Sequence, residues 1–178
     1  MQKSRYLLPD LLAPGLRVVF CGSALGAMSY RLQAPYANPG NKFWRALHEA
    51  GITPRRMAPS EYRELLALGI GLTDINKTQF GNDVDLNREH DDAASLLRKV
   101  KRYRPGVLAF TAKRPAQVFL REVFGTRGPP PYGPQPERVG ETRIFVLTSP
   151  SGRAGSFWTL APWRDLARLL NTHKMVQN

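Results

Sequence analysis

The sequence has one cysteine, few acidic residues and no long apolar run. With Cys21 as the only cysteine among 178 residues, neither an intrachain disulfide nor a four-cysteine zinc or iron–sulfur site can form. No apolar stretch approaches the roughly 20 residues of a membrane span, and the N-terminus lacks the apolar core of a signal peptide. These absences favour a reducing compartment, so we expect a cytoplasmic, nucleoid-associated protein without a membrane partner.

Patterns for metals and nucleotide cofactors are also missing. His48, His90 and His173 are scattered along the chain and form no spacing typical of a metal site. The Lys-Ser/Thr ending of a Walker A motif is absent, as is the G-x-G-x-x-G motif of dinucleotide-binding proteins. We therefore expect no metal and no cofactor.

The charge is strongly one-sided. Lysine and arginine number 26 against 14 acidic residues, which gives a formal net charge of +12. Such a surface attracts polyanions through phosphate neutralisation and counterion release, which favours a nucleic-acid partner. A basic surface that serves solubility is the alternative. The same alternative, a solvated face, is favoured for the basic residues Arg98, Lys99, Lys101, Arg102 and Arg104.

Apolar runs alternate with helical patterns along the chain, which fits one domain over residues 1–178. Four short runs rich in β-branched or aromatic residues predict strands at residues 16–21, 69–75, 106–110 and 143–148. Helices are predicted at residues 41–50, 61–67, 89–103, 112–124 and 162–172. Strands that are apolar on both faces and separated by helices are typical of a parallel sheet. We predict an α/β fold, a three-layer α/β/α sandwich with a short central, mainly parallel sheet.

Two loops that follow predicted strands have an unusual composition. Ligands of such sheets bind beyond the carboxyl ends of the strands, so this is where functional residues are expected. In the first loop, Gly22 and Gly26 let backbone N–H groups approach a ligand closely. The second loop, at residues 149–155, has the proline and small residues of a rigid turn. By contrast, the proline-rich residues 128–136 fit neither a helix nor a central strand and predict an extended surface loop.

Together these loops resemble the mismatch-specific uracil-DNA glycosylases and their relatives, the thymine-DNA glycosylases. The similarity begins at residues 9–16 (PDLLAPGL) and continues through residues 22–26 (GSALG) to residues 41–44 (NKFW). It closes with residues 149–155 (SPSGRAG). The resemblance implies an α/β sandwich around a short parallel sheet. It also implies an enzyme that extrudes a base from DNA and reads it in a pocket.

The resemblance assigns the first loop to base recognition. Tyr36 lies where the family places an aromatic ring that stacks on the flipped base, and packing beneath the helix that starts near Asn41 is the alternative for this ring. Asn41 either buttresses the loop or begins that helix. The other residues of the implied base pocket are Gly22, Ser23, Ala24 and Gly26.

The second loop is implied to contact DNA through Ser149, Ser151, Gly152 and Arg153. Arg153 takes the place of the wedge that fills the space of the flipped base. A guanidinium can stack on a base and also hydrogen-bond to the orphaned partner or a phosphate, which predicts a relaxed opposite-base preference. Ser149 replaces a larger residue, so its contact with the DNA backbone is expected to be shorter or lost. Each of these residues also fits an ordinary loop.

The chemistry departs most from the family at Ala24, where the family usually has an asparagine that helps hold the attacking water. N-glycosidic cleavage produces an oxocarbenium-like sugar and an anionic base, and a carboxylate beside the water would serve it. Asp74, at the carboxyl end of a predicted strand, is our candidate catalytic residue. Pairing with Lys77 or an arginine, or capping a turn, is the alternative. Asp83 and Asp85 are weaker candidates.

These observations predict a monofunctional DNA glycosylase that excises uracil, and related damaged or mismatched pyrimidines, from double-stranded DNA as a monomer. Single-stranded DNA stays open as a second substrate. The main alternative is a DNA-binding relic of the same fold, because Ala24 cannot orient water. A nucleotide-cofactor enzyme ranks last. A Schiff-base lyase through Lys42 or Lys77 is disfavoured because nothing in the sequence indicates a desolvated lysine.

Overall fold

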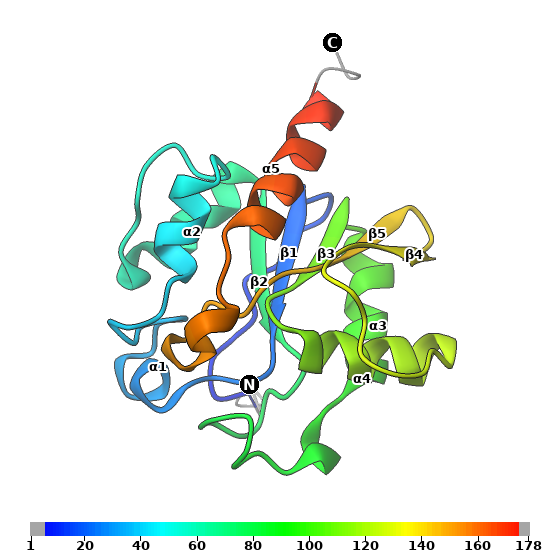
Figure 1. Cartoon of the computed structure of the whole chain (residues 1–178), viewed down its shortest axis with the longest axis horizontal. Coiled ribbons are helices and arrows are strands. Elements are labelled where there is room, and N and C mark those ends of the chain that lie inside the picture. The colour runs from blue at the N-terminus through cyan, green and yellow to red at the C-terminus, as the bar shows by residue number, and fades with distance from the viewer. Residues whose placement is uncertain (1–5, 175–178) are drawn as a thin grey trace, which may run out of the picture.

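A five-stranded sheet forms the centre of the computed structural model, which describes residues 6–174, with side chains as far as residue 172 (Figure 1). The strand order is β2-β1-β3-β5-β4. The parallel strands are β1 (Val18–Gly22), β2 (Ile70–Asp74), β3 (Val107–Phe110) and β5 (Thr142–Val146). The antiparallel strand β4 (Gly133–Val139) pairs with β5 at one edge. All four predicted strands and the mainly parallel sheet are confirmed.

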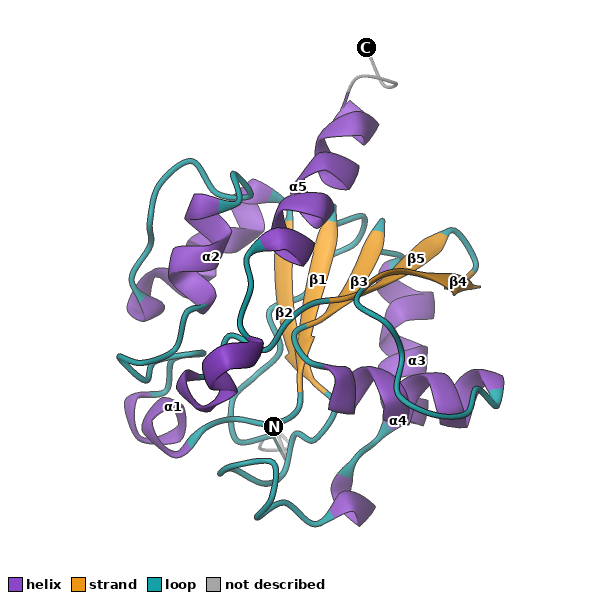
Figure 2. Cartoon of the chain, viewed as in Figure 1, coloured by secondary structure: helices purple, strands orange, loops and turns teal. Residues whose placement is uncertain are grey.

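Helices cover both faces of the sheet, as Figure 2 shows. One face carries α2 (Phe43–Glu49), the 3-10 helix η1 (Pro59–Leu68) and α5 (Ala161–Lys174). The other face carries α3 (Ala93–Tyr103) and α4 (Lys113–Phe124). The alternation of side chains along a strand builds both cores, since Phe20 packs with Trp163 on the first face and Cys21 belongs to the core on the second. The predicted three-layer sandwich is therefore confirmed.

Some predicted elements differ from the structure. The predicted helix at residues 89–103 is divided into the short 3-10 helix η2 (Arg88–His90) and α3, and α1 (Ala27–Leu32) was not predicted. The predicted loop at residues 128–136 is wrong from residue 133 onward, where β4 begins. An edge strand tolerates Pro134 and Pro136 because only one side of it is paired, and the register of β4 shifts between Pro134 and Arg138. No helix within residues 6–174 is long and apolar enough to cross a bilayer.

The N-terminal segment covers the free edge of β2. Leu11 and Leu72 exchange two backbone hydrogen bonds of 2.9 Å. Gly71 allows this close approach, because a Cβ atom at that position would lie 2.7 Å from the Leu11 carbonyl oxygen. The pairing removes an exposed strand edge and carries Asp10 to the end of β2, beside Thr73.

Candidate active site

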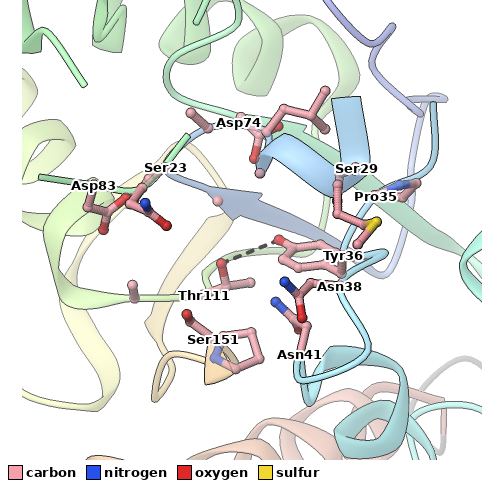
Figure 3. Close-up of a pocket in the computed structure, with 18 of the residues that line it drawn as sticks. Ser23, Ser29, Pro35, Tyr36, Asn38, Asn41, Asp74, Asp83, Thr111 and Ser151 are labelled. Carbon is pink, nitrogen blue, oxygen red and sulfur yellow. Dashed lines mark hydrogen bonds between the residues drawn. The ribbon is translucent and has the colours of Figure 1, made fainter. Parts of the chain in front are cut away.

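A cavity of about 680 Å³ opens at the carboxyl ends of the parallel strands (Figure 3). Its volume falls in the range of roughly 300–1,000 Å³ that is typical of small-molecule sites. Loops that follow β1, β2, β3 and β5 line it, although they are far apart in the sequence. The residues predicted for the base pocket and the DNA-contacting loop line this one cavity, and so does Asp74, the first candidate for catalysis. These residues are Gly22, Ser23, Ala24, Gly26, Tyr36, Asn41, Asp74, Ser149, Ser151, Gly152 and Arg153.

Three polar side chains converge on Gly22 at the end of β1. A Cβ atom built on Gly22 would lie 2.5 Å from Asp74 Oδ1, 3.1 Å from the Tyr36 hydroxyl and 3.6 Å from Thr111 Oγ1. The parallel register places Gly22 directly beside Asp74. The missing side chain therefore creates the space in which a carboxylate, a phenol and a hydroxyl meet.

Asp74 is partly buried and, within the described part of the chain, forms no ion pair. A backbone hydrogen bond from Gly22 is its polar contact in the site. Burial raises the pKa of Asp74 above its ordinary value; the positive charge of Lys77 opposes the shift, and the negative charge of Asp10 adds to it. A carboxylate with a raised pKa is a better proton acceptor near neutral pH than an ordinary aspartate.

Lys77 does not pair with Asp74, so that alternative for Asp74 is wrong. Its ammonium lies 3.0 Å from Asp10 Oδ1, while Lys99 lies 2.7 Å from Asp10 Oδ2 and the Thr73 hydroxyl donates to Asp10 at 2.7 Å. The Lys77 side chain is 8% exposed and the Asp10 side chain 13%. Lys99 was predicted to belong to a solvated basic face of α3. The structure corrects this, because the N-terminal segment brings Asp10 against it.

Tyr36 belongs both to the core and to the cavity wall. Its ring stacks on the buried Phe43 of α2, with 3.8 Å between ring centroids and 13° between the ring planes. Packing against the helix after Asn41 is thus real, and the same ring also lines the cavity. Its hydroxyl lies 3.3 Å from Thr111 Oγ1, as the dashed line in Figure 3 marks. Burial raises the pKa of Tyr36, so the phenol is neutral at physiological pH.

Backbone strain accompanies this placement of Tyr36. Its φ of +50° lies in the left-handed region, which a bulky residue adopts at a cost of about 1–3 kcal/mol. The following residue is held by a hydrogen bond of 3.0 Å from the Ala37 backbone N–H to Ser29 Oγ. The fold therefore maintains a costly conformation at the point where this aromatic ring enters the cavity.

Asn41 lies just before the N-cap Lys42 of α2 and contacts the first residue of that helix, which fits one of its two predicted roles. Its Oδ1 accepts a hydrogen bond of 2.9 Å from the Phe43 backbone N–H. Among the described residues it makes no hydrogen bond to residues 22–26, so the buttressing role gains no support. It still lines the cavity, together with Asn38, whose Oδ1 accepts from the Gly40 backbone N–H.

The second loop is fixed against the segment that precedes α2. The Lys42 backbone N–H donates to the Pro150 carbonyl at 2.7 Å. A Cβ atom on Gly152 would lie 3.1 Å from the Gly40 carbonyl oxygen, so glycine allows the two backbones to touch. Ser151 caps the start of η3 (Gly152–Phe157) by accepting from the Arg153 backbone N–H at 3.2 Å. Arg153 is exposed at the rim of the cavity.

Other predicted groups divide between the cavity and its surroundings. Asp83 lines the cavity, whereas Asp85 accepts a hydrogen bond from Asn82 outside it. The Lys42 ammonium lies over the ring of Trp158, 5.6 Å from its centroid. Among the side chains that the structure describes, no three His, Cys, Asp or Glu residues are grouped to hold a metal ion. The side chain of His173 lies outside that set.

Thr111 is a cavity residue that sequence reasoning missed. It follows β3 directly, as Asp74 ends β2, and its Oγ1 lies 3.5 Å from the Cys21 carbonyl oxygen. Its position after a predicted strand was the available signal. The wall formed by Leu8, Pro9 and Leu11 was also missed, because only the tertiary pairing with β2 brings it to the cavity.

Comparisons with known proteins agree with this architecture. The fold is similar to that of a Methanosarcina acetivorans protein solved by solution NMR and provisionally named a uracil DNA glycosylase, with a TM-score of 0.65. The two sequences are 24% identical over 92% of this chain and 96% of that chain, which shows the shared fold alone. A family model described as the Uracil DNA glycosylase superfamily matches residues 9–167. Because this match spans most of the chain, the protein belongs to the uracil DNA glycosylase superfamily.

Proposed function

We propose that this protein is a monofunctional DNA glycosylase that flips uracil out of duplex DNA, including uracil mismatched with guanine, and hydrolyses its N-glycosidic bond. The observation that carries the proposal is the carboxylate of Asp74. It has no ion-pair partner in the described chain and stands at the end of β2, where Gly22, Tyr36 and Thr111 converge. Membership of the superfamily and the net charge of +12 support DNA as the partner.

Tyr36 and the Gly22–Gly26 loop supply contacts that suit a nucleobase. One face of the Tyr36 ring is covered by Phe43, so its remaining surface toward the cavity offers a platform for stacking, worth roughly 1–3 kcal/mol for one base. The neutral Tyr36 hydroxyl can donate a hydrogen bond to a base oxygen. Backbone groups of Ser23 and Ala24 lie in the same wall and can read the pyrimidine edge.

Asp74 would act on the water that replaces the base. As the bond between C1′ of the sugar and N1 of uracil breaks, its electron pair leaves with the base, and positive charge develops on the sugar. The water oxygen bonds to C1′ and passes a proton to Asp74. The carboxylate thereby stabilises the developing cation and serves as general base, a contribution of about 10²–10⁴ in rate. This role compensates for Ala24, whose methyl group cannot orient water.

The test is single-turnover release of uracil from a G·U duplex by the native chain and by Asp74→Asn, with DNA binding measured in parallel. We expect the rate to fall by about a hundredfold or more while binding is retained. Asp83→Asn is the matched control, because Asp83 also lines the cavity. It should keep a rate close to native. A·U, G·T and single-stranded uracil substrates then measure the opposite-base and strand preference.

A DNA-binding relic is the second candidate, favoured by Ala24 in the loop. If neither the native chain nor Asp74→Asn releases uracil and both bind DNA, the relic is correct. If both are equally fast, Asp74 is structural. The search for the general base then moves to Asp83 and to water held by backbone groups.

A further inference from the structure

A second groove lies behind the N-terminal segment that forms one wall of the cavity. Its volume is about 480 Å³, and it runs between that segment and α3, the helix on the face of the sheet opposite α2 and α5 (Figure 2). Leu11 lines the active cavity, whereas its neighbours Asp10 and Leu12 line this groove. One extended segment therefore separates two hollows, and the proposed chemistry uses only one of them.

The helix α3 gives the groove a basic side. Residues spaced three or four positions apart share this side of the helix, and those that line the groove are Ser95, Arg98, Lys99, Arg102 and Tyr103. The helix contains no acidic residue, and within the described chain Arg98 and Arg102 form no ion pair. Like charges four positions apart on a helix repel each other. The fold therefore gathers positive charge here without an acidic side chain to balance the two arginines.

Asp10 is the acidic side chain among the described residues that line the groove, and its charge is already compensated. One carboxylate oxygen lies 3.0 Å from the Lys77 ammonium, and the other lies 2.7 Å from the Lys99 ammonium. Two ammonium groups against one carboxylate leave an excess of positive charge, and the two arginines add to it. An anion that enters the groove is therefore attracted, although one carboxylate forms part of the wall.

Arginine suits a phosphate group, because its planar guanidinium donates two parallel hydrogen bonds to two phosphate oxygens. We propose that the groove between α3 and the N-terminal segment binds a phosphate group through Arg98 and Arg102, with the Ser95 hydroxyl as a further donor. The site lies outside the active cavity and does not depend on uracil excision. Its ligand is either the backbone of DNA or a free phosphate compound, and the two arms of the test separate these sources.

The first arm measures binding of duplex DNA without uracil, so catalysis plays no part. Arg98→Gln combined with Arg102→Gln removes two charges from the groove. The matched control, Lys101→Gln combined with Arg104→Gln, removes two charges from the same helix and its C-terminal cap, outside the groove. If DNA supplies the phosphate, the groove variant should bind about tenfold more weakly and lose about one unit from the slope of log affinity against log salt. The control should stay within about twofold of native at physiological salt, where distant charges are screened.

The second arm titrates inorganic phosphate at constant ionic strength and follows the backbone amide chemical shifts by NMR. We expect saturable shifts at α3 and at residues 10–12 in the native chain and in the control, and their loss in the groove variant. Saturable shifts with unchanged DNA binding in the groove variant would assign the site to a free phosphate compound. A loss of DNA binding confined to the groove variant would assign it to the DNA backbone.

A conservative variant separates a shaped site from simple charge. Arg98→Lys combined with Arg102→Lys keeps both charges but loses the paired hydrogen bonds, so it should keep the native salt slope and bind more weakly than the native chain. Equal behaviour of the groove variant and its control in both arms, whether native or weakened, would overturn the site. The rate of uracil release is measured separately, and its absence would count against the proposed function and not against this groove.

Discussion

Asp10 and Asp74 are two carboxylates at the same end of β2, and their surroundings are opposite. Asp10 is bound by the ammonium groups of Lys77 and Lys99 and by the Thr73 hydroxyl. Burial by itself raises the pKa of Asp10, but the two lysines and the hydrogen bonds outweigh it, and the pKa is lowered. Asp74 receives a backbone hydrogen bond and faces the cavity, and its pKa is raised by burial.

The difference separates a carboxylate that holds the fold together from one that is left reactive. Asp10 joins the N-terminal segment to β2 and α3, because its carboxylate forms ion pairs with Lys77 and Lys99 and accepts a hydrogen bond from Thr73. Asp74 forms no ion pair in the described chain because Lys77, the cation with the largest influence on its pKa, is engaged by Asp10. Within the described chain, the ion pair of Asp10 thus leaves Asp74 without an ion-pair partner, while the positive charge of Lys77 still opposes the rise in the pKa of Asp74.

The largest expected effect is on stability, at Asp10. Asp10→Asn leaves Lys77 and Lys99 partly buried without a carboxylate, and breaking a buried pair in this way costs about 3–5 kcal/mol. We expect the free energy of unfolding, measured in urea, to fall by that amount. Asp74→Asn should leave the free energy of unfolding equal or slightly higher at neutral pH, because the variant removes a partly buried charge that has no ion-pair partner in the described chain. Equal destabilisation by both variants would erase the distinction between the two carboxylates.

The next effect is on the rate, at Gly22. In Gly22→Ala the added Cβ atom would lie 2.5 Å from Asp74 Oδ1, which is too close, so the Asp74 carboxylate must move. A displacement of about 1 Å at a reacting group can cost a hundredfold, and we expect a single-turnover rate lower by about that factor. Gly26→Ala serves as the control. Its Cβ would meet only Ser29 Oγ, at 4.0 Å, and φ at Gly26 is −72°. A native rate for Gly22→Ala would show that Asp74 need not stand where it does.

The sequence predicted this site better than it predicted what surrounds it. Asp74 and the Gly22 loop follow buried strands, and a local apolar pattern is enough to locate the carboxyl end of each strand. Topology then brings these ends together, so the predicted residues share one cavity. The edge strand β4 escaped prediction because only its end residues, Gly133 and Val139, are buried and because it includes two prolines, a pattern that also fits a loop.

The roles of Asp10 and Lys99 depend on contacts that no local pattern reveals. Asp10 meets Thr73 across 63 positions of the sequence, through an N-terminal segment that pairs with β2. Lys99 lies on the helix α3 among exposed arginines, and its periodicity gives no sign that another segment covers it. For the same reason, the sequence could not decide between an ion pair for Asp74 and a free carboxylate.

The smallest expected effect is a shift in pH dependence, and it has opposite signs at the two carboxylates. Because the folded pKa of Asp74 lies above its ordinary value of 3.8, the single-turnover rate should fall at a higher pH than an unperturbed aspartate predicts. The stability contributed by Asp10 is present above pH 3.8 and is lost only as the pH falls through its lowered folded pKa. The pH dependence of the single-turnover rate measures the effect at Asp74, and urea unfolding at a series of acid pH values measures the effect at Asp10.

Lys77→Met sharpens this last comparison. Two cations lower the pKa of Asp74, and Lys77 has a larger influence than Lys99. The Asp10 carboxylate raises this pKa. The neighbouring Cys21 and Tyr36 side chains are uncharged. Without Lys77, the pKa of Asp74 should rise further, and the acid limb of the rate profile should move to higher pH. Lys99→Met should move it in the same direction by less. An acid limb that stays in place in Lys77→Met would assign it to a group other than Asp74, because a purely structural loss lowers the rate at every pH without moving the limb.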